Sequence, residues 1–205
     1  MDSNGFRIMN TISFSHFYGE DINKVATDFA QLRISVFREF PYLYEGTLAY
    51  EYEYIKTYSS SKEALLFAVY EQDKMVGATT CIPLKDETEA VQLPFKNANF
   101  NCTEIFYFGE SLLLPQYRSR GLGHRFFMER EAHAQSFKKY KFTTFCAVLR
   151  QDNHPLKPNN YVPHDAFWIK KGYQKNEQLI CKMDWQDIDK NYTDSKDLIF
   201  WIKQI

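Results

Sequence analysis

Two glycines and two arginines crowd residues 113–124, Leu-Leu-Pro-Gln-Tyr-Arg-Ser-Arg-Gly-Leu-Gly-His, between an apolar strand pattern and a helical pattern. Gly121 and Gly123 would let the backbone approach a ligand closely, and the N–H groups that open a helix have no partners within it. Arg118 and Arg120 add whole positive charges to the partial charge of the helix dipole. This combination predicts a turn that binds phosphate or pyrophosphate.

The Gly-x-Gly spacing in this turn is weak evidence by itself. The dinucleotide-binding fingerprint needs a third glycine, and a P-loop needs Gly-Lys followed by Ser or Thr, and the stretch contains neither. The alternative interpretation is a tight connection between a strand and a helix, with arginines that are simply solvated.

Glu110 is the single carboxylate in the apolar strand pattern 106–114. A half-buried carboxylate is costly to ionise unless it is paired, so its pKa tends to rise toward the range useful to a general base. The competing interpretation is a satisfied ion pair or a solvent-facing side chain. Cys146 is interpreted as a small buried residue rather than a nucleophile, because no histidine lies near it in the sequence.

The composition predicts one folded domain over residues 1–205, since 44% of the residues are hydrophobic and 25% are charged. The net charge of −1 gives no attraction to nucleic acid or to an anionic membrane, so neither is expected as a partner. The four cysteines are widely spaced and no histidine stands at zinc-finger spacing, so no metal is expected. The N-terminus has no apolar run typical of a signal or a membrane span, which favours a cytoplasmic protein.

The periodicity of apolar residues predicts an α/β (α+β) fold with a central mixed, mostly antiparallel sheet flanked by helices. Residues 85–103 are expected to be irregular, and the strand over 179–185 is expected to close the chain's regular structure. The expected strands are 6–14, 64–70, 75–84, 105–114, 142–149 and 179–185, and the expected helices are 22–40, 48–58, 121–140 and 165–171.

The run Arg118-x-x-Gly121-x-Gly123, with Pro115 upstream and the apolar Leu113 before it, resembles the acetyl-CoA-binding motif Q/R-x-x-G-x-G/A of the GNAT N-acetyltransferases. The order of elements is also similar to that family over nearly the whole chain. The loop 152–158 is similar to GNAT domains found fused to nitrilase-type hydrolases, although this sequence has no hydrolase portion.

The resemblance implies that acetyl-CoA is the acyl donor and that the main chain of the motif binds its pyrophosphate. Leu113 would pair its main chain with the pantetheine arm, and its N–H could stabilise the oxyanion of the intermediate. The cofactor-binding positions implied are Leu113, Leu114, Arg118, Ser119, Arg120, Gly121, Leu122, Gly123 and His124. The reaction implied is direct attack by a neutral amine on the thioester in a ternary complex.

The sequence departs from the family at the general acid. Many members have a Tyr four residues before the glycine of a terminal Gly-Phe/Tyr pair, and here that position is Trp168. Tyr161 and Tyr173 are the candidates to replace it, although most tyrosines in a chain that is 17% aromatic pack in the core. The alternative function is a non-catalytic module that binds or senses acyl-CoA.

The acceptor expected for such an enzyme is a small-molecule or peptide amine, and a homodimer is left open. In the family, the first two helices and their connection form part of the acceptor wall. Residues 39–45 and 50–54 interleave acids with aromatics, which suits a cationic amine with an apolar body. A solvated acidic helix face explains the same pattern equally well.

Overall fold

The computed structural model describes residues 12–205 and contains one seven-stranded sheet in the order β1-β2-β3-β4-β5-β7-β6. Neighbouring strands are antiparallel except β4 and β5, which are parallel. The mixed, mostly antiparallel sheet expected from the sequence is therefore confirmed. The strands are β1 (Ile12–Tyr18), β2 (Leu65–Glu71), β3 (Lys74–Pro83), β4 (Ile105–Leu113), β5 (Phe142–Val148), β6 (Gln174–Gln186) and β7 (Thr193–Gln204).

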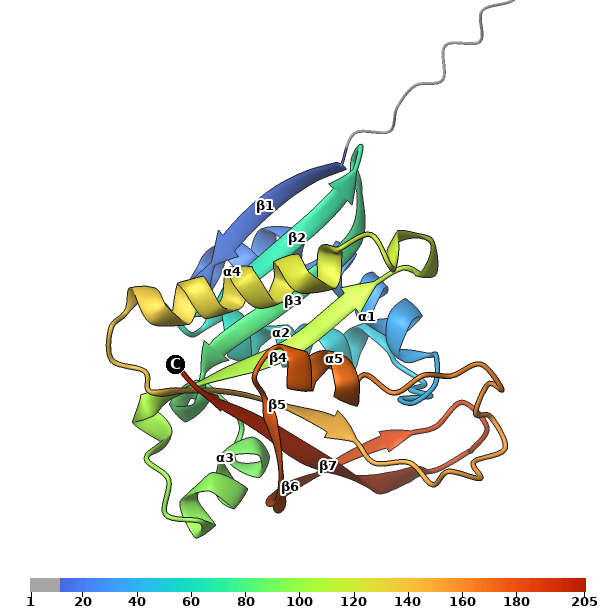
Figure 1. Cartoon of the computed structure of the whole chain (residues 1–205). Coiled ribbons are helices and arrows are strands. Elements are labelled where there is room, and N and C mark those ends of the chain that lie inside the picture. The colour runs from blue at the N-terminus through green and yellow to red at the C-terminus, as the bar shows by residue number, and fades with distance from the viewer. Residues whose placement is uncertain (1–11) are drawn as a thin grey trace, which may run out of the picture.

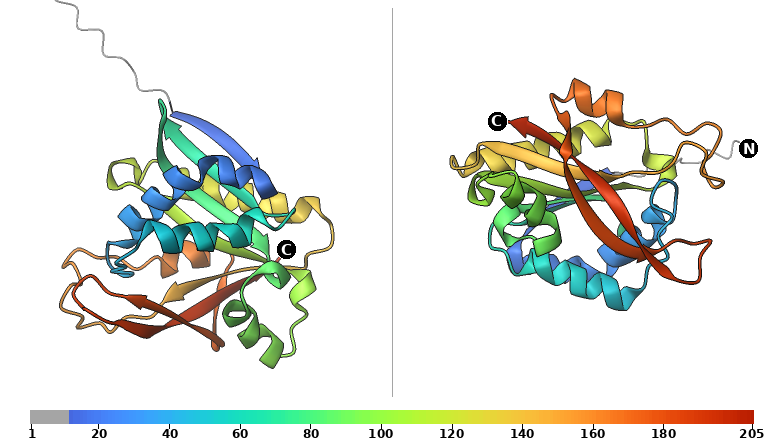
Figure 2. Two further views of the ribbon diagram at one scale, coloured as in Figure 1. Left: turned by 180° about the vertical axis from the view of Figure 1, so that it is seen from behind. Right: turned by 90° about the horizontal axis from the view of Figure 1, so that it is seen from below.

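Helices cover both faces of this sheet. In Figure 1, α4 and α5 lie in front of the sheet, and the view from behind in Figure 2 shows α1 and α2 across the opposite face. The helices are α1 (Ala26–Phe37), α2 (Leu48–Ser59), α3 (Glu89–Asn97), α4 (Leu122–Ser136) and α5 (Asp165–Lys170). Within residues 12–205, none of them is long and apolar enough to cross a membrane.

The core is divided by the sheet into a part behind it and a part in front of it. Behind the sheet, the buried side chains of α1 and α2 meet those of β4, including Tyr107 and Leu112. In front, Phe106 and Phe108 of the same strand pack with Phe127 of α4. Successive side chains of β4 point to opposite faces of the sheet, so this strand buries apolar area in both layers.

The pairing of β4 with β5 ends early. It covers only Ile105↔Phe142 to Tyr107↔Thr144, whereas β5 stays paired with β7 along its full length. The remainder of β4, residues 108–113, is paired with β3 on one edge, and no strand of the described residues pairs with its other edge. The two parallel strands therefore separate like the arms of a V (Figure 1).

A bulge interrupts β4 within the separated part. The register with β3 changes between Thr79 and Cys81, which face Ser111 and Phe108, so β4 has one extra residue there. A Cβ atom at Gly109 would collide with the hydroxyl groups of Tyr58 and Thr80. Glycine is required at this position because the chain approaches its neighbours so closely.

The structure differs from the sequence-based expectation at both ends and in one loop. The first strand continues to residue 18, past the expected end at 14, and the expected residues 6–11 lie outside the described part of the chain. The segment 85–103 contains α3, and the chain adds β7 after β6. The segment 198–202 of β7 is a continuous apolar run, as expected for a strand that is buried on both faces.

Candidate active site

A cleft of about 970 Å³ opens where β4 and β5 separate. One half of the cleft, on the α4 side, is lined by α4, α5 and the loop before α4. The other half, on the α1 side, is lined by residues 36–43 and by the loop after β5. The cleft brings together half of the twelve candidate site residues from the sequence, namely Glu110, Leu113, Arg118, Ser119, Gly123 and Tyr161. Cys146 and Trp168, which the sequence analysis also considers, line it as well.

Leu113 presents its main chain to this cleft. The N–H of Leu114 donates to the carbonyl of Val76 on β3, at 3.0 Å. Successive residues of a strand direct their N–H and C=O groups to opposite edges, so those of Leu113 point to the open edge. Nε of Arg118 donates to the Leu113 carbonyl at 3.1 Å, and the Leu113 N–H remains available to a ligand.

The loop before α4 exposes a set of backbone N–H groups. Gly121 is the N-cap of α4 with a φ of 82°, and Ser119 has a φ of 60°. Within residues 12–205, no backbone carbonyl accepts a hydrogen bond from the N–H groups of residues 119–124, and no side chain caps the helix. These N–H groups, which include those of Arg120, Leu122 and His124, lie at the positive end of the helix dipole, as an anion requires.

The positive charges beside this loop differ in their partners. Nη1 of Arg118 donates to Glu39 at 2.7 Å, so a carboxylate offsets much of its charge. The Arg120 guanidinium lies 5.3 Å from the centre of the Tyr117 ring, and no carboxylate in the described chain pairs with it. His124 packs edge-on against Phe167 with ring centres 5.0 Å apart. Arg120 is therefore the freest positive charge at the loop.

Glu110 is buried and engaged on the α1 side of the sheet. Its carboxylate forms an ion pair with Arg33 and accepts a hydrogen bond from the Thr80 hydroxyl. Arg33 also pairs with the fully buried Glu51, which in turn accepts from the Tyr44 hydroxyl at 2.8 Å. An adjacent guanidinium stabilises the ionised form of a carboxylate and weakens it as a base. This geometry favours the ion-pair interpretation of Glu110 over the general-base interpretation.

The two tyrosines considered as general acids lie in different places. Tyr161 lines the cleft and packs edge-on against Phe40, with ring centres 4.7 Å apart. Tyr173 is 1% exposed, and its hydroxyl is hydrogen-bonded to Thr143 at 2.8 Å and donates to Glu131 at 3.2 Å. Tyr173 is not among the lining residues, because it packs into the core in front of the sheet. Tyr161 is the only one of the two that a ligand in the cleft could touch.

Three of the lining residues that were not singled out from the sequence bear on the chemistry of the cleft. Burial and the charge of Arg118 lower the pKa of His164, so its imidazole is neutral at pH 7. Trp201 is 2% exposed and its Nε1–H has no acceptor within the described chain. Arg130 is also 2% exposed. A short motif does not identify them, because each reaches the cleft only through the packing of distant elements.

The α1-side half of the cleft has apolar and aromatic walls. Phe40 faces Tyr161 and His154 across it, and the lining also includes Val36, Phe37, Tyr42, Leu149 and Leu156. The acids of the segments 39–45 and 50–54 are paired: Glu39 with Arg118, Glu45 with Arg38, Glu51 with Arg33 and Glu53 with Lys56. The acidic wall considered from the sequence is therefore largely neutralised.

A buried ion pair fixes this wall to the sheet. Arg150, just after β5, donates to both carboxylate oxygens of Asp187 at 2.7 and 2.8 Å. The same guanidinium donates to the carbonyls of Pro41 and Tyr42 at 2.7 and 2.6 Å. A single cation thus holds the wall segment 36–43 against β5 and the turn after β6.

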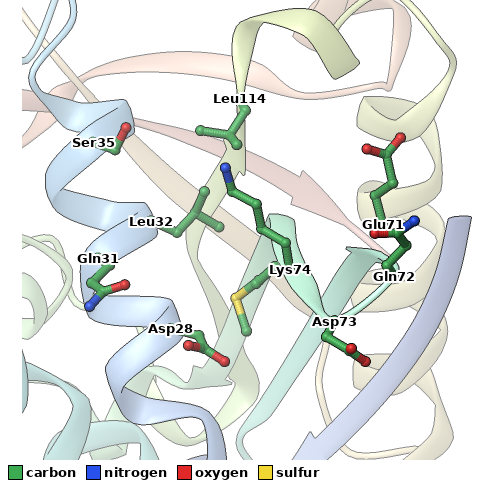
Figure 3. Close-up of a pocket in the computed structure, with 10 residues that line it drawn as sticks. Asp28, Gln31, Leu32, Ser35, Glu71, Gln72, Asp73, Lys74 and Leu114 are labelled. Carbon is green, nitrogen blue, oxygen red and sulfur yellow. The ribbon is translucent and has the colours of Figure 1, made fainter. Parts of the chain in front are cut away.

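A second hollow, of about 610 Å³, lies between α1 and the turn that joins β2 to β3. Figure 3 shows the amino group of Lys74 reaching toward Leu114, with Asp28 and Asp73 on the walls. Glu71, at its edge, accepts a hydrogen bond from Tyr117 at 2.7 Å and so anchors the segment that precedes the arginines of the loop. No metal-binding group of three His, Cys, Asp or Glu side chains is found within residues 12–205.

The sequence matches no protein-family model and no curated protein. Solved structures nevertheless share the fold. An acetyltransferase from Streptococcus agalactiae is 12% identical with a TM-score of 0.58, and the match covers 95% of this chain and 98% of that one. NAA60 of Arabidopsis thaliana in complex with acetyl-CoA is 12% identical with a TM-score of 0.59, covering 95% and 99%. A GNAT-family acetyltransferase from Streptococcus pneumoniae is 13% identical with a TM-score of 0.56, covering 94% and 100%. The chain therefore has the GNAT acetyltransferase fold.

Replacing Asp187 by Asn should destabilise the protein by about 3–5 kcal/mol at pH 7, because it leaves the buried Arg150 without its counterion. Burial alone would raise the pKa of Asp187, but the hydrogen bonds and charge of Arg150 lower it below the ordinary 3.8. A lowered pKa stabilises the fold above the unfolded value, and this stabilisation is lost as the pH falls through the folded value. Urea unfolding at pH 7 and below pH 4 measures both effects.

The matched control for this substitution is Glu45→Gln, which breaks the exposed pair with Arg38. It should cost at most about 1 kcal/mol. Equal stability losses in the two variants, or a loss for Asp187→Asn that does not shrink in acid, would contradict the role given to the Arg150–Asp187 pair.

Proposed function

We propose that this protein transfers an acetyl group from acetyl-CoA to a primary amine within the cleft between β4 and β5. The observation that carries the proposal is the alignment of two main-chain features. The N–H groups of residues 119–124, which have no backbone acceptor among residues 12–205, lie at one end of β4, and the open edge of β4 leads from them into the cleft. A donor with a pyrophosphate and an extended amide-containing arm fits this combination.

The loop before α4 would hold the pyrophosphate through the N–H groups of Ser119 to His124, assisted by the charge of Arg120. The main chain of Leu113 would bind the extended arm as an added strand does, with its N–H donating to an amide carbonyl of that arm. Leu114 is committed to β3 through its N–H, so its contribution is to fix the position of Leu113. These roles use backbone groups and depend little on side-chain identity.

The acceptor best suited to the α1-side half of the cleft is a primary amine on an apolar or aromatic body. Phe37, Phe40 and Tyr42 supply rings, while the nearby acids are already paired with arginines or lysine. An acceptor with further charges would lose hydration there without finding a free counterion. Small molecules and peptide N-termini with an apolar first residue both meet this description.

The carboxylates that line the cleft are poorly suited to accept the proton that the amine releases. Glu39, Glu110 and Asp165 line it, and each is paired with a basic side chain. We therefore expect the acceptor to enter as the free amine and its nitrogen to release one of its two protons after attack. Tyr161 is the candidate to return a proton to the sulfur.

Release of free thiol from acetyl-CoA in the presence of an amine panel tests the proposed function. Aromatic and apolar primary amines should give turnover, and amines that carry a carboxylate or a second cation should give much less. Binding of CoA with no thiol release for any amine would contradict the enzyme and favour an acyl-CoA sensor. Faster turnover of the charged amines would contradict the acceptor class.

Gly123→Val should weaken CoA binding at least tenfold, equivalent to about 1.4 kcal/mol, because a branched side chain would stand between the pyrophosphate and the N–H groups. A Cβ at position 123 meets only Phe167, at 3.7 Å, so the fold should tolerate it. The control is Ala132→Val, which places the same side chain on an exposed position of α4. Calorimetry that finds equal CoA affinity in both folded variants would remove the loop from the binding site.

Glu110→Gln should leave kcat within about threefold of the wild-type value, since a positioned base is worth about 10²–10⁴-fold and Glu110 is committed to Arg33. In both proteins, kcat/KM should rise with pH until the acceptor's own ammonium group is deprotonated. Two acceptors of different amine pKa separate this behaviour from titration of the enzyme. A loss of 100-fold or more, recovered at high pH, would restore Glu110 as the base.

A further inference from the structure

Arg130 is a buried cation that pairs with no carboxylate of the described residues. It lies on the face of α4 that packs against the sheet and is 2% exposed. Its Nε donates to the carbonyl of Phe126, and its Nη1 donates to the carbonyl of Glu110, each at 3.3 Å. Within residues 12–205, no carboxylate oxygen lies within 4.0 Å of its nitrogens. Three of its five N–H bonds are thus without an acceptor in the described chain.

The Arg130 side chain lies near the point where β4 and β5 separate, which we call the apex of the V. The guanidinium lies 4.4 Å from the ring centre of Phe108 and 4.8 Å from that of Phe127, and it lines the cleft beside Gly109. These two rings shield the charge from water and hold it at the bulge of β4.

Each titratable group near Arg130 is either neutral at pH 7 or paired with another residue. Those that influence its charge are Tyr173 just before β6, Cys81 of β3, Glu131 of α4 and Tyr58 of α2. Burial lowers the pKa of Arg130 to about 10, so it stays positively charged at pH 7. Glu131 is occupied by Lys203, at 2.9 Å, and by Tyr173.

A buried charge without a counterion is costly. Arg130 differs in this respect from Arg33, the other buried arginine that packs on the sheet. Arg33 lies between two carboxylates, Glu51 and Glu110. A cation kept dry without a counterion is complementary to an anion that forms only during the reaction, because no solvent needs to be rearranged when that anion appears. The apex of the V, at the end of the open edge of β4, is where the reacting end of the extended arm would lie.

We propose that Arg130 stabilises the thiolate of CoA as it leaves, which makes it a catalytic residue of the proposed acetyl transfer. This inference rests on the proposed function. It explains how the chain can dispense with the tyrosine that the related motif carries, since Trp168 stands at that position and its indole cannot act as an acid. Arg130 lowers the demand on any proton donor, including Tyr161.

The chemical step balances without a further reactant. The lone pair of the amine nitrogen forms a C–N bond to the thioester carbon, and the carbonyl electrons move to oxygen. When the carbonyl re-forms, the C–S bond breaks and its electron pair remains on sulfur, facing the guanidinium. The nitrogen releases one proton and the thiolate takes up one, so the products are the amide and CoA thiol.

The pKa of the CoA thiol bound to the protein tests this role directly and needs no acceptor or turnover. Thiolate absorbance in the ultraviolet, followed against pH for the CoA complex, should give a pKa below that of free CoA. In Arg130→Met the pKa of the bound thiol should rise by about one unit or more, the effect of losing an opposite charge within 4–6 Å. Arg130→Lys should retain part of the lowering.

Desulfo-CoA, which has no thiol, separates this role from a structural one. Its affinity should be the same for wild type, Arg130→Met and Tyr161→Phe, which shows that the site is folded in each. A bound-thiol pKa that is equal in wild type and Arg130→Met would overturn the assignment while leaving acetyl-CoA binding intact. A wild-type protein that binds neither CoA nor desulfo-CoA would overturn the proposed function itself, and this inference with it.

Discussion

The separation of β4 from β5 beyond Tyr107 and Thr144 is the constraint on which the rest of the cleft depends. Continuous pairing with β7 holds β5 in its own direction, while pairing with β3 holds β4 in another. The edge of β4 between them keeps main-chain groups that a closed sheet would consume. A strand edge of this kind is normally an aggregation hazard, and here α4, α5 and the segment 36–43 enclose it.

Charge is distributed around this opening in an uneven way. On the α1 side, Arg33 and Arg150 are buried with carboxylates and fix the elements that form the wall. On the α4 side, none of the described residues supplies a carboxylate to the buried Arg130 or a backbone acceptor to the N–H groups of residues 119–124. The side with satisfied charges is suited to holding shape, and the side with unsatisfied positive potential is suited to holding an anionic donor.

Local patterns in the sequence were sufficient for the loop before α4, for the hairpin of β2 and β3, and for the fold class. They failed where a partner distant in sequence decides the outcome. For Glu110 they left a general base and an ion pair both open, because Arg33, 77 residues earlier, becomes its neighbour only when α1 packs on the sheet. The helix α3 was missed because it buries only Val91 and Phe95 and contains Pro94. Neither Tyr161 nor Tyr173 could be assigned to the cleft without knowing which face of the sheet each one meets.

An amide-resolved NMR titration with CoA tests the central claim most directly, because it reports on the two main-chain features that define the site. If CoA binds at the loop before α4 and along β4, the backbone signals of residues 119–124 and of Leu113 should change most, with saturation at a single affinity. Changes confined to other regions, such as the hollow between α1 and the β2–β3 turn, or no saturable change at all, would contradict it.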